Sequence, residues 1–201
     1  MNKIYGLSIA LLIGILTSCS IFSPVKSEPQ TKYVLDNVPR VHPKKPHRPI
    51  TLLVAQPETN SAYHTNQIAY RTQPYQIAYY AKHQWVDRPG EMLRPLIVQA
   101  LQDTHYFHAV ITPPSTGHYD YIVNTQIEEV LQDYSHNMPV VRLTVRAEII
   151  RATNYKVIAT KQFQIIKPII QCSPYAGVFV MNQATADMLQ QLTQFCLKNI
   201  S

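Results

Sequence analysis

The alternation of apolar and polar residues is clearest at residues 141–149, where it is typical of a strand with one buried face. The apolar side is formed by Val141, Leu143, Val145, Ala147 and Ile149. Shorter β-rich runs predict further strands at residues 51–55, 67–71, 75–80, 107–111, 119–131 and 157–166. Turns at residues 72–74 and 153–156 predict that the strands beside them pair. The last three strands are predicted to form an antiparallel meander.

Two stretches instead repeat apolar residues every three or four positions, which predicts helices. The first follows Asp87 and Pro89 and runs to Leu101. Pro95 interrupts it, so this helix either begins near Arg94 or is kinked at Pro95. The second covers residues 180–199, with an apolar stripe of Ala184, Met188, Leu192, Phe195 and Cys196. These elements predict an α+β domain, a mostly antiparallel sheet with two helices packed on one face.

Two other kinds of sequence precede this domain. Residues 4–16 are mostly apolar and follow the single cation Lys3. The run is shorter than the roughly 20 residues of a membrane-spanning helix, so residues 1–18 are predicted to be a cleaved signal peptide. Residues 19–49 are rich in proline, which predicts an extended tether with room for a short strand at 33–35. Residues 50–201 then form one domain.

Cys19 is the predicted attachment point of a lipid. Leu16 stands three places before it, with Thr17 and Ser18 between, which resembles a bacterial lipobox. In such a sequence the cysteine receives a diacylglycerol, and several acyl chains such as palmitate anchor the protein stably. Ser20 stands where inner-membrane lipoproteins carry an aspartate, so the expected location is the periplasmic face of the outer membrane. The alternative is an ordinary cleaved signal followed by a chance cysteine.

The formal net charge of the chain is +6. In a cytoplasmic protein this charge would suggest a nucleic-acid partner, but export excludes nucleic acid and leaves anionic lipid, lipopolysaccharide or an acidic protein. The most basic stretch, residues 40–48, either contacts anionic head groups or is a solvated linker.

Two further cysteines, Cys172 and Cys196, remain besides the predicted anchor. In an oxidising periplasm such a pair is expected to form a disulfide. The bond would pin the end of the last helix to the loop that precedes it. The alternative is two buried free thiols.

The sequence contains none of the common catalytic motifs, and its five glycines are too few to suggest phosphate-binding loops. No catalytic residue and no cofactor is therefore expected. One group of residues invites comparison with metal ligands: His105, His108, His118 and Asp120. The first helix is predicted to end before Phe107, which spoils the spacing on one helical face, so no metal is expected. A lipid-modifying hydrolase that uses His105 and His108 is a disfavoured alternative.

A series of short motifs runs through the mature chain in a fixed order. It comprises residues 33–35, 53–57, 68–71 and 78–81, then Trp85, Pro89, Met92, Leu93, Leu96, Phe107, Val110, residues 119–121, Asn182 and Ala184. In this order, behind a lipobox, the series resembles the ABC-type transport auxiliary lipoproteins, the PqiC-like family. Residues 41–49, rich in proline and histidine, depart from the family pattern and leave the tether length open.

The resemblance implies a non-enzymatic lipoprotein of an ABC-type lipid transport system, with phospholipid as the expected cargo. It would dock an MCE-domain tunnel protein, with its inner-membrane components, at the outer membrane, and could act as a homo-oligomer. Aromatic residues are favoured at interfaces, so the predicted docking residues are Tyr70, Arg71, Tyr79, Tyr80 and Trp85. A core position is the alternative for Trp85. The alternative function is a structural lipoprotein that assists assembly of another envelope machine, such as a secretion apparatus.

Overall fold

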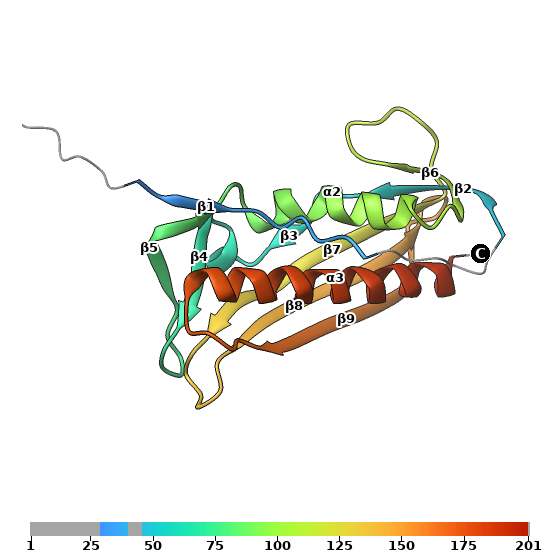
Figure 1. Cartoon of the computed structure of the whole chain (residues 1–201). Helices are drawn as coiled ribbons and strands as arrows, with labels where there is room; N and C mark the ends of the chain where they lie inside the picture. Colours follow the sequence, from blue (N-terminus) through green and yellow to red (C-terminus); the bar gives the residue numbers. More distant parts are fainter. Residues whose placement is uncertain (1–28, 40–45, 201) are drawn as a thin grey trace, which may run out of the picture.

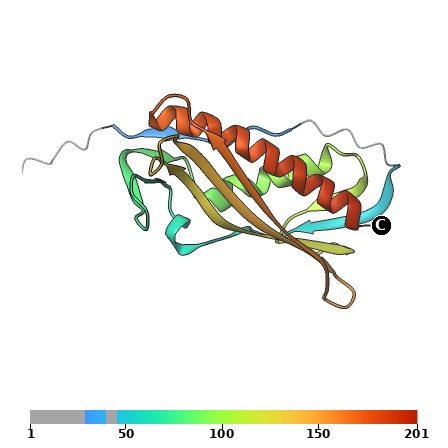
Figure 2. The same cartoon turned by 90° about the horizontal axis from the view of Figure 1, so that it is seen from below.

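A computed structural model describes residues 29–39 and 46–200 of the chain (Figure 1). Its strands are β1 (Thr31–Tyr33), β2 (Arg48–Val54), β3 (Glu58–Thr59), β4 (Gln67–Arg71), β5 (Ala78–Trp85), β6 (Phe107–Ile111), β7 (Tyr121–Asp133), β8 (Val140–Arg151) and β9 (Lys156–Pro168). Its helices are η1 (Ser61–Tyr63), α2 (Pro89–Gln102) and α3 (Pro174–Asn199). The predicted α+β class is confirmed, with α2 and α3 on one face of a curled sheet (Figures 1 and 2).

Strand β7 organises the sheet. One of its edges pairs with β8 along most of its length. The other edge pairs in succession with β2, β3 and β4, so that Leu52, Glu58 and Tyr70 stand opposite Tyr121, Gln126 and Gln132. These three pairings are parallel, as are β1 with β5 and β2 with β6. The sheet is therefore mixed: its longest ladders, β7–β8 and β8–β9, are antiparallel as predicted, whereas these short parallel pairings were not predicted.

The predicted antiparallel meander is confirmed in β7, β8 and β9, which hold the longest ladders. The five apolar residues predicted for the inner face of β8 are all buried, none more than 3% exposed. The predicted hairpin of residues 67–71 with the strand that follows is also confirmed, because β4 and β5 pair antiparallel. The alternation of apolar and polar residues therefore predicted correctly which face of β8 is buried.

Helix α2 begins at Pro89 and passes through Pro95 without ending. Pro89 suits the first helical position because the amide hydrogen it lacks would have no partner there. Pro95 lies on the exposed side of the helix. Solvent can therefore hydrogen-bond the backbone carbonyl that Pro95 leaves unpaired.

Helix α3 begins at Pro174, earlier than the predicted Val180. Ser173 caps it, because its hydroxyl accepts a hydrogen bond from the Ala176 backbone N–H at 3.2 Å. The predicted apolar stripe of this helix is confirmed, since all five of its residues are buried against the sheet. The helix is therefore longer than expected but oriented as expected.

Part of the predicted tether packs against the domain. Strand β1 pairs with β5, and Leu35 just beyond it is 5% exposed. The Asn182 side chain on α3 holds the same segment: its Oδ1 accepts from the Asp36 N–H at 2.9 Å and its Nδ2 donates to the Val34 carbonyl at 3.0 Å. The packed part of the chain therefore starts near Thr31, before the predicted boundary at residue 50.

Among residues 29–39 and 46–200, no helix is long and apolar enough to cross a membrane. Cys19, the predicted lipid attachment point, lies outside the described residues, as does most of the basic stretch at 40–48.

Candidate functional site

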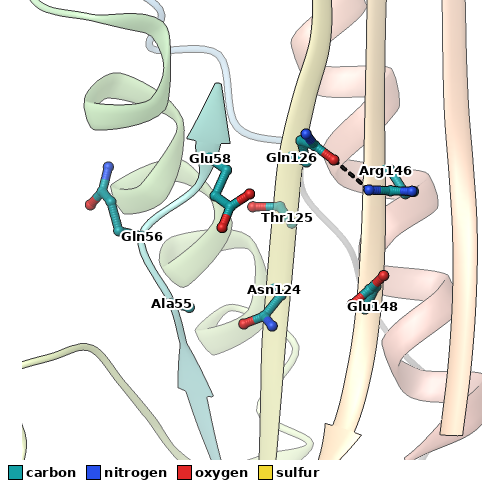
Figure 3. Close-up of a pocket in the computed structure, with 8 residues that line it drawn as sticks. All are labelled: Ala55, Gln56, Glu58, Asn124, Thr125, Gln126, Arg146 and Glu148. Carbon is teal, nitrogen blue, oxygen red and sulfur yellow. Dashed lines mark hydrogen bonds between the residues drawn. The ribbon is translucent and has the colours of Figure 1, made fainter. Parts of the chain in front are cut away.

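A polar cleft of about 170 Å³ opens on the sheet at the break between β2 and β3 (Figure 3). One wall is formed by Gln56, in the segment that joins these strands, and by Glu58, the first residue of β3. The floor and the other wall are β7 and β8, where Asn124 stands opposite Glu148 and Gln126 opposite Arg146. Side chains that share one strand face and oppose one another across a ladder lie close together, which gathers these groups.

The groups that line this cleft are amides, carboxylates, a hydroxyl and a guanidinium. Arg146 donates to the Gln126 Oε1 at 2.5 Å and lies 3.7 Å from the Glu128 carboxylate. The Thr125 hydroxyl is buried and has no hydrogen-bond partner among the described residues. The residues that line the cleft include no histidine or cysteine, so it offers no nucleophile paired with an imidazole base.

Three of the five predicted docking residues gather where β4, β5 and β7 meet. The Asp133 carboxylate, 0% exposed, accepts from Arg71 at 2.5 Å and from Arg142 at 2.9 Å. Burial alone would raise the pKa of Asp133, but hydrogen bonds from Arg71, Ser135 and Arg142 hold that pKa well below its usual range. The hydrogen bond to Asp133 in turn raises the pKa of Arg71. Arg71 therefore neutralises a buried carboxylate.

Tyr70 and Tyr80 stack beside this ion cluster, with ring centroids 4.4 Å apart. The Tyr80 hydroxyl donates to the Gln132 Oε1 at 3.1 Å, and the Tyr134 hydroxyl donates to the same atom at 3.0 Å. Burial raises the pKa of both Tyr80 and Tyr134. These phenols stay neutral and act as hydrogen-bond donors within the fold.

The other two predicted docking residues lie apart from this group. Trp85 is 2% exposed, which confirms the alternative reading that it is a core residue and leaves it no surface for a partner. Tyr79 is 37% exposed, and its hydroxyl donates to the Ala62 carbonyl at 2.8 Å. Of the five, Tyr79 presents the most open side chain.

The histidines do not assemble into a metal site in the part of the chain that the structure describes, where no three His, Cys, Asp or Glu residues come together. His118 lies 3.8 Å from Asp120. The Asp120 carboxylate already has a partner within the fold, because its Oδ2 accepts a hydrogen bond from the Thr51 backbone N–H at 2.8 Å. His108 instead lies near His47, with ring centroids 6.2 Å apart.

The predicted disulfide is wrong. Cys172 is free and exposed just before α3, whereas Cys196 is free and buried near the other end of that helix. The intervening helix has about 22 residues and separates them by about 33 Å, while a disulfide needs Cα atoms within about 7 Å. The prediction failed because it placed residues 174–179 in a loop that could fold back.

One surface was missed at the sequence level. Large apolar side chains are exposed around the first two turns of α3: Ile170 is 93% exposed, Tyr175 65%, Phe179 56% and Val34 45%. We call these four residues the α3 aromatic surface. Tyr175 and Phe179 are four residues apart, a spacing that places both on the helix face opposite the buried stripe. This spacing was readable once the helix start at Pro174 was known.

Comparisons with known proteins match the chain to one protein family and to solved structures with a similar fold. The family model for the ABC-type transport auxiliary lipoprotein component matches residues 33–193. The crystal structure of a Xanthomonas campestris protein of family DUF330 is similar, with a TM-score of 0.77, 21% identity, and coverage of 84% of this chain and 96% of that one. The crystal structure of an uncharacterized protein is also similar, with a TM-score of 0.63, 15% identity, and coverage of 83% of this chain and 98% of that one. No curated protein sequence matches the chain significantly.

Proposed function

Because the chain belongs to the family of ABC-type transport auxiliary lipoprotein components, we propose that it is a non-enzymatic, outer-membrane-anchored auxiliary of an MCE-type lipid transport system. The observation that carries the proposal is the extent of the family match. Residues 33–193 run from the end of β1 to the last turns of α3, so the match covers the domain and not an isolated motif.

The polar cleft does not have the size or the lining of a lipid-binding pocket. The polar cleft holds about 170 Å³, below the roughly 300–1,000 Å³ of pockets that take drug-sized ligands. Its lining is amide, carboxylate and guanidinium, which would not bury acyl chains. This cleft is therefore too small and too polar to enclose the transported phospholipid, which supports a docking role for the domain.

In this proposal each part of the chain has one task. Acyl chains on Cys19 hold the protein at the periplasmic face of the outer membrane. The residues that follow form a tether that lets the domain extend away from the membrane. The domain binds the periplasmic tunnel protein, which carries MCE domains and connects to inner-membrane components. For that contact we propose the exposed edge of Tyr79, since Tyr70, Arg71 and Tyr80 are engaged within the fold and Trp85 is buried.

The test is affinity purification of the full-length lipoprotein from gently solubilised envelopes, followed by mass spectrometry of the proteins and lipids recovered with it. An MCE-domain protein among the partners supports the proposal. Secretion or assembly components without an MCE-domain protein support the alternative function and overturn this one. A Tyr79→Ala variant should recover less of the partner, whereas a Tyr155→Ala variant, altered at the exposed β8–β9 turn, should recover it fully.

A further inference from the structure

The exposed face of α3 changes from aromatic to polar along the length of the helix. Its exposed positions are Tyr175, Phe179, Gln183, Gln190, Gln194 and Lys198, each four or seven residues after the last. The first two are aromatic, the next three are glutamine and the last is lysine. Aromatic exposure is therefore confined to the N-terminal end of the helix, where the solvated surface would otherwise continue with polar residues.

Segments beside the N-terminal end of α3 form two grooves with it. One groove, of about 580 Å³, lies between α3 and the segment after β1 and includes Val34 and Tyr175. A second, of about 510 Å³, lies between α3 and the end of β9 and includes Ile170. Phe179 lines both grooves, so it forms the ridge between them. Contiguous exposed apolar side chains of this kind mark protein or membrane interaction sites.

The path of the chain indicates which of these partners the surface meets. The Tyr33 ring of β1 lies 6.4 Å from the Tyr175 ring, so the chain enters the domain beside the α3 aromatic surface. Cys19 and Thr31 are 12 positions apart, which limits the chain between them to about 40 Å. An acyl group on Cys19 therefore keeps the membrane within reach of this end of α3.

We propose that the α3 aromatic surface inserts into the head-group region of the membrane that carries the anchor. This inference rests on the Cys19 anchoring of the proposed function. Tyrosine and other amphipathic rings are enriched at membrane interfaces, and an acyl anchor with a second, weaker contact orients a protein where an anchor alone does not. Lys32 and Lys167 line the two grooves, but Asp36 lies in the same groove as Lys32 and Asp187 pairs with Lys167 at 2.8 Å, so the apolar side chains and not net charge carry the contact.

The test uses the full mature chain with Cys19→Ala, so that binding without the acyl anchor is measured. The probe is sedimentation with mixed phosphatidylethanolamine–phosphatidylglycerol vesicles. The added changes Tyr175→Gln and Phe179→Gln continue the glutamine line of α3 and should weaken vesicle binding by about tenfold or more. The matched control is Tyr155→Gln, which removes a tyrosine that is 74% exposed at the β8–β9 turn and should leave binding unchanged.

Three results would overturn the inference. The first is no vesicle binding by the parent protein, and the second is equal binding by all variants. The third is conversion of an oligomer to a monomer by the double variant with no loss of vesicle binding, which would assign the surface to a second copy of the chain. Thermal unfolding of each variant checks that the fold is kept. None of these results depends on an MCE-domain partner, so they separate failure of this inference from failure of the proposed transport role.

Discussion

Gly177 of α3 lies so close to Gln132 of β7 that a Cβ atom added to the glycine would stand 2.2 Å from the Gln132 Cδ. The Gln132 side chain cannot easily withdraw, because it accepts from Tyr80 and Tyr134 and its Nε2 donates to the Pro174 carbonyl at 3.3 Å. The glycine therefore permits the first turn of α3 to seat on this amide.

Gly177→Ala is expected to destabilise the domain by about 1–3 kcal/mol, since either the helix or the Gln132 amide must shift. Urea unfolding followed by circular dichroism measures the change. Gly117→Ala is the control, because the nearest atom to an added Cβ there, the Ser115 Oγ, is 3.6 Å away. Equal unfolding midpoints for the two variants would contradict the close packing.

Asp133→Asn is expected to destabilise the domain by about 3 kcal/mol, because it leaves the guanidinium groups of Arg71 and Arg142 without their buried counter-charge. Asp103→Asn, at an exposed carboxylate, should have little effect. Unfolding free energies of the two variants at neutral pH provide the comparison.

Acid should remove the same stabilisation. The folded-state pKa of Asp133 lies below the unfolded value of about 3.9, so its contribution is complete above that pH and is lost as the pH falls through the folded-state pKa. In the Asp133→Asn variant, the decline of stability below about pH 4 should be shallower than in the unchanged protein. Parallel stability curves would show that Asp133 does not set the acid limit.

The two thiols should react very differently. Burial raises the pKa of Cys196 to about 12, so almost no thiolate is present in the folded protein at neutral pH. A thiol reagent should label Cys172 alone in the native mature protein and both cysteines in denaturant without reductant. If denatured, unreduced protein releases no thiol, the two cysteines are bridged and the geometry of α3 is wrong.

Asn182→Ala should loosen the segment that follows β1. The change removes the hydrogen bonds to the Asp36 N–H and the Val34 carbonyl, at a cost of about 1–2 kcal/mol. Hydrogen exchange at residues 34–38 should accelerate while exchange in β8 stays slow. Gln183→Ala, at the exposed neighbouring position, is the control and should leave exchange in both regions unchanged.

Cys19→Ala should move most of the protein from the membrane to the soluble periplasmic fraction with its unfolding temperature unchanged. The α3 aromatic surface alone gives only weak, reversible binding, because stable anchoring needs two signals. Fractionation and immunoblotting measure the distribution. A variant that stays in the membrane fraction would show that Cys19 is not the anchor.

Local patterns in the sequence predicted most elements of this fold. Residues 67–71 and 107–111 were predicted as strands and form β4 and β6 with these bounds. The family resemblance was also correct, since the family match spans residues 33–193. These successes share a cause: side-chain period and residue order are properties of short stretches and need no knowledge of distant partners.

What failed depended on distant contacts or on a helix boundary. The parallel pairings of β7 with β2, β3 and β4 join strands far apart in the chain and leave no local period. The Ser173–Pro174 pair was a readable helix start, a capping residue followed by proline at the first position, and its omission produced the false disulfide. The inward roles of Arg71 and Tyr80 could not be predicted because Asp133 and Gln132 meet them only through the sheet.

The direction of α3 limits how far the C-terminal end of the domain can lie from the proposed membrane contact. Its first turn lies beside the entry of the chain at β1 and its last turn lies at the C-terminal end of the domain (Figure 1). A helix of 26 residues spans about 39 Å. If its aromatic end lies in the head-group layer, the C-terminal end can stand up to about 4 nm from that membrane. A fluorophore placed beyond Ile200 would therefore measure how far the domain extends from the membrane surface.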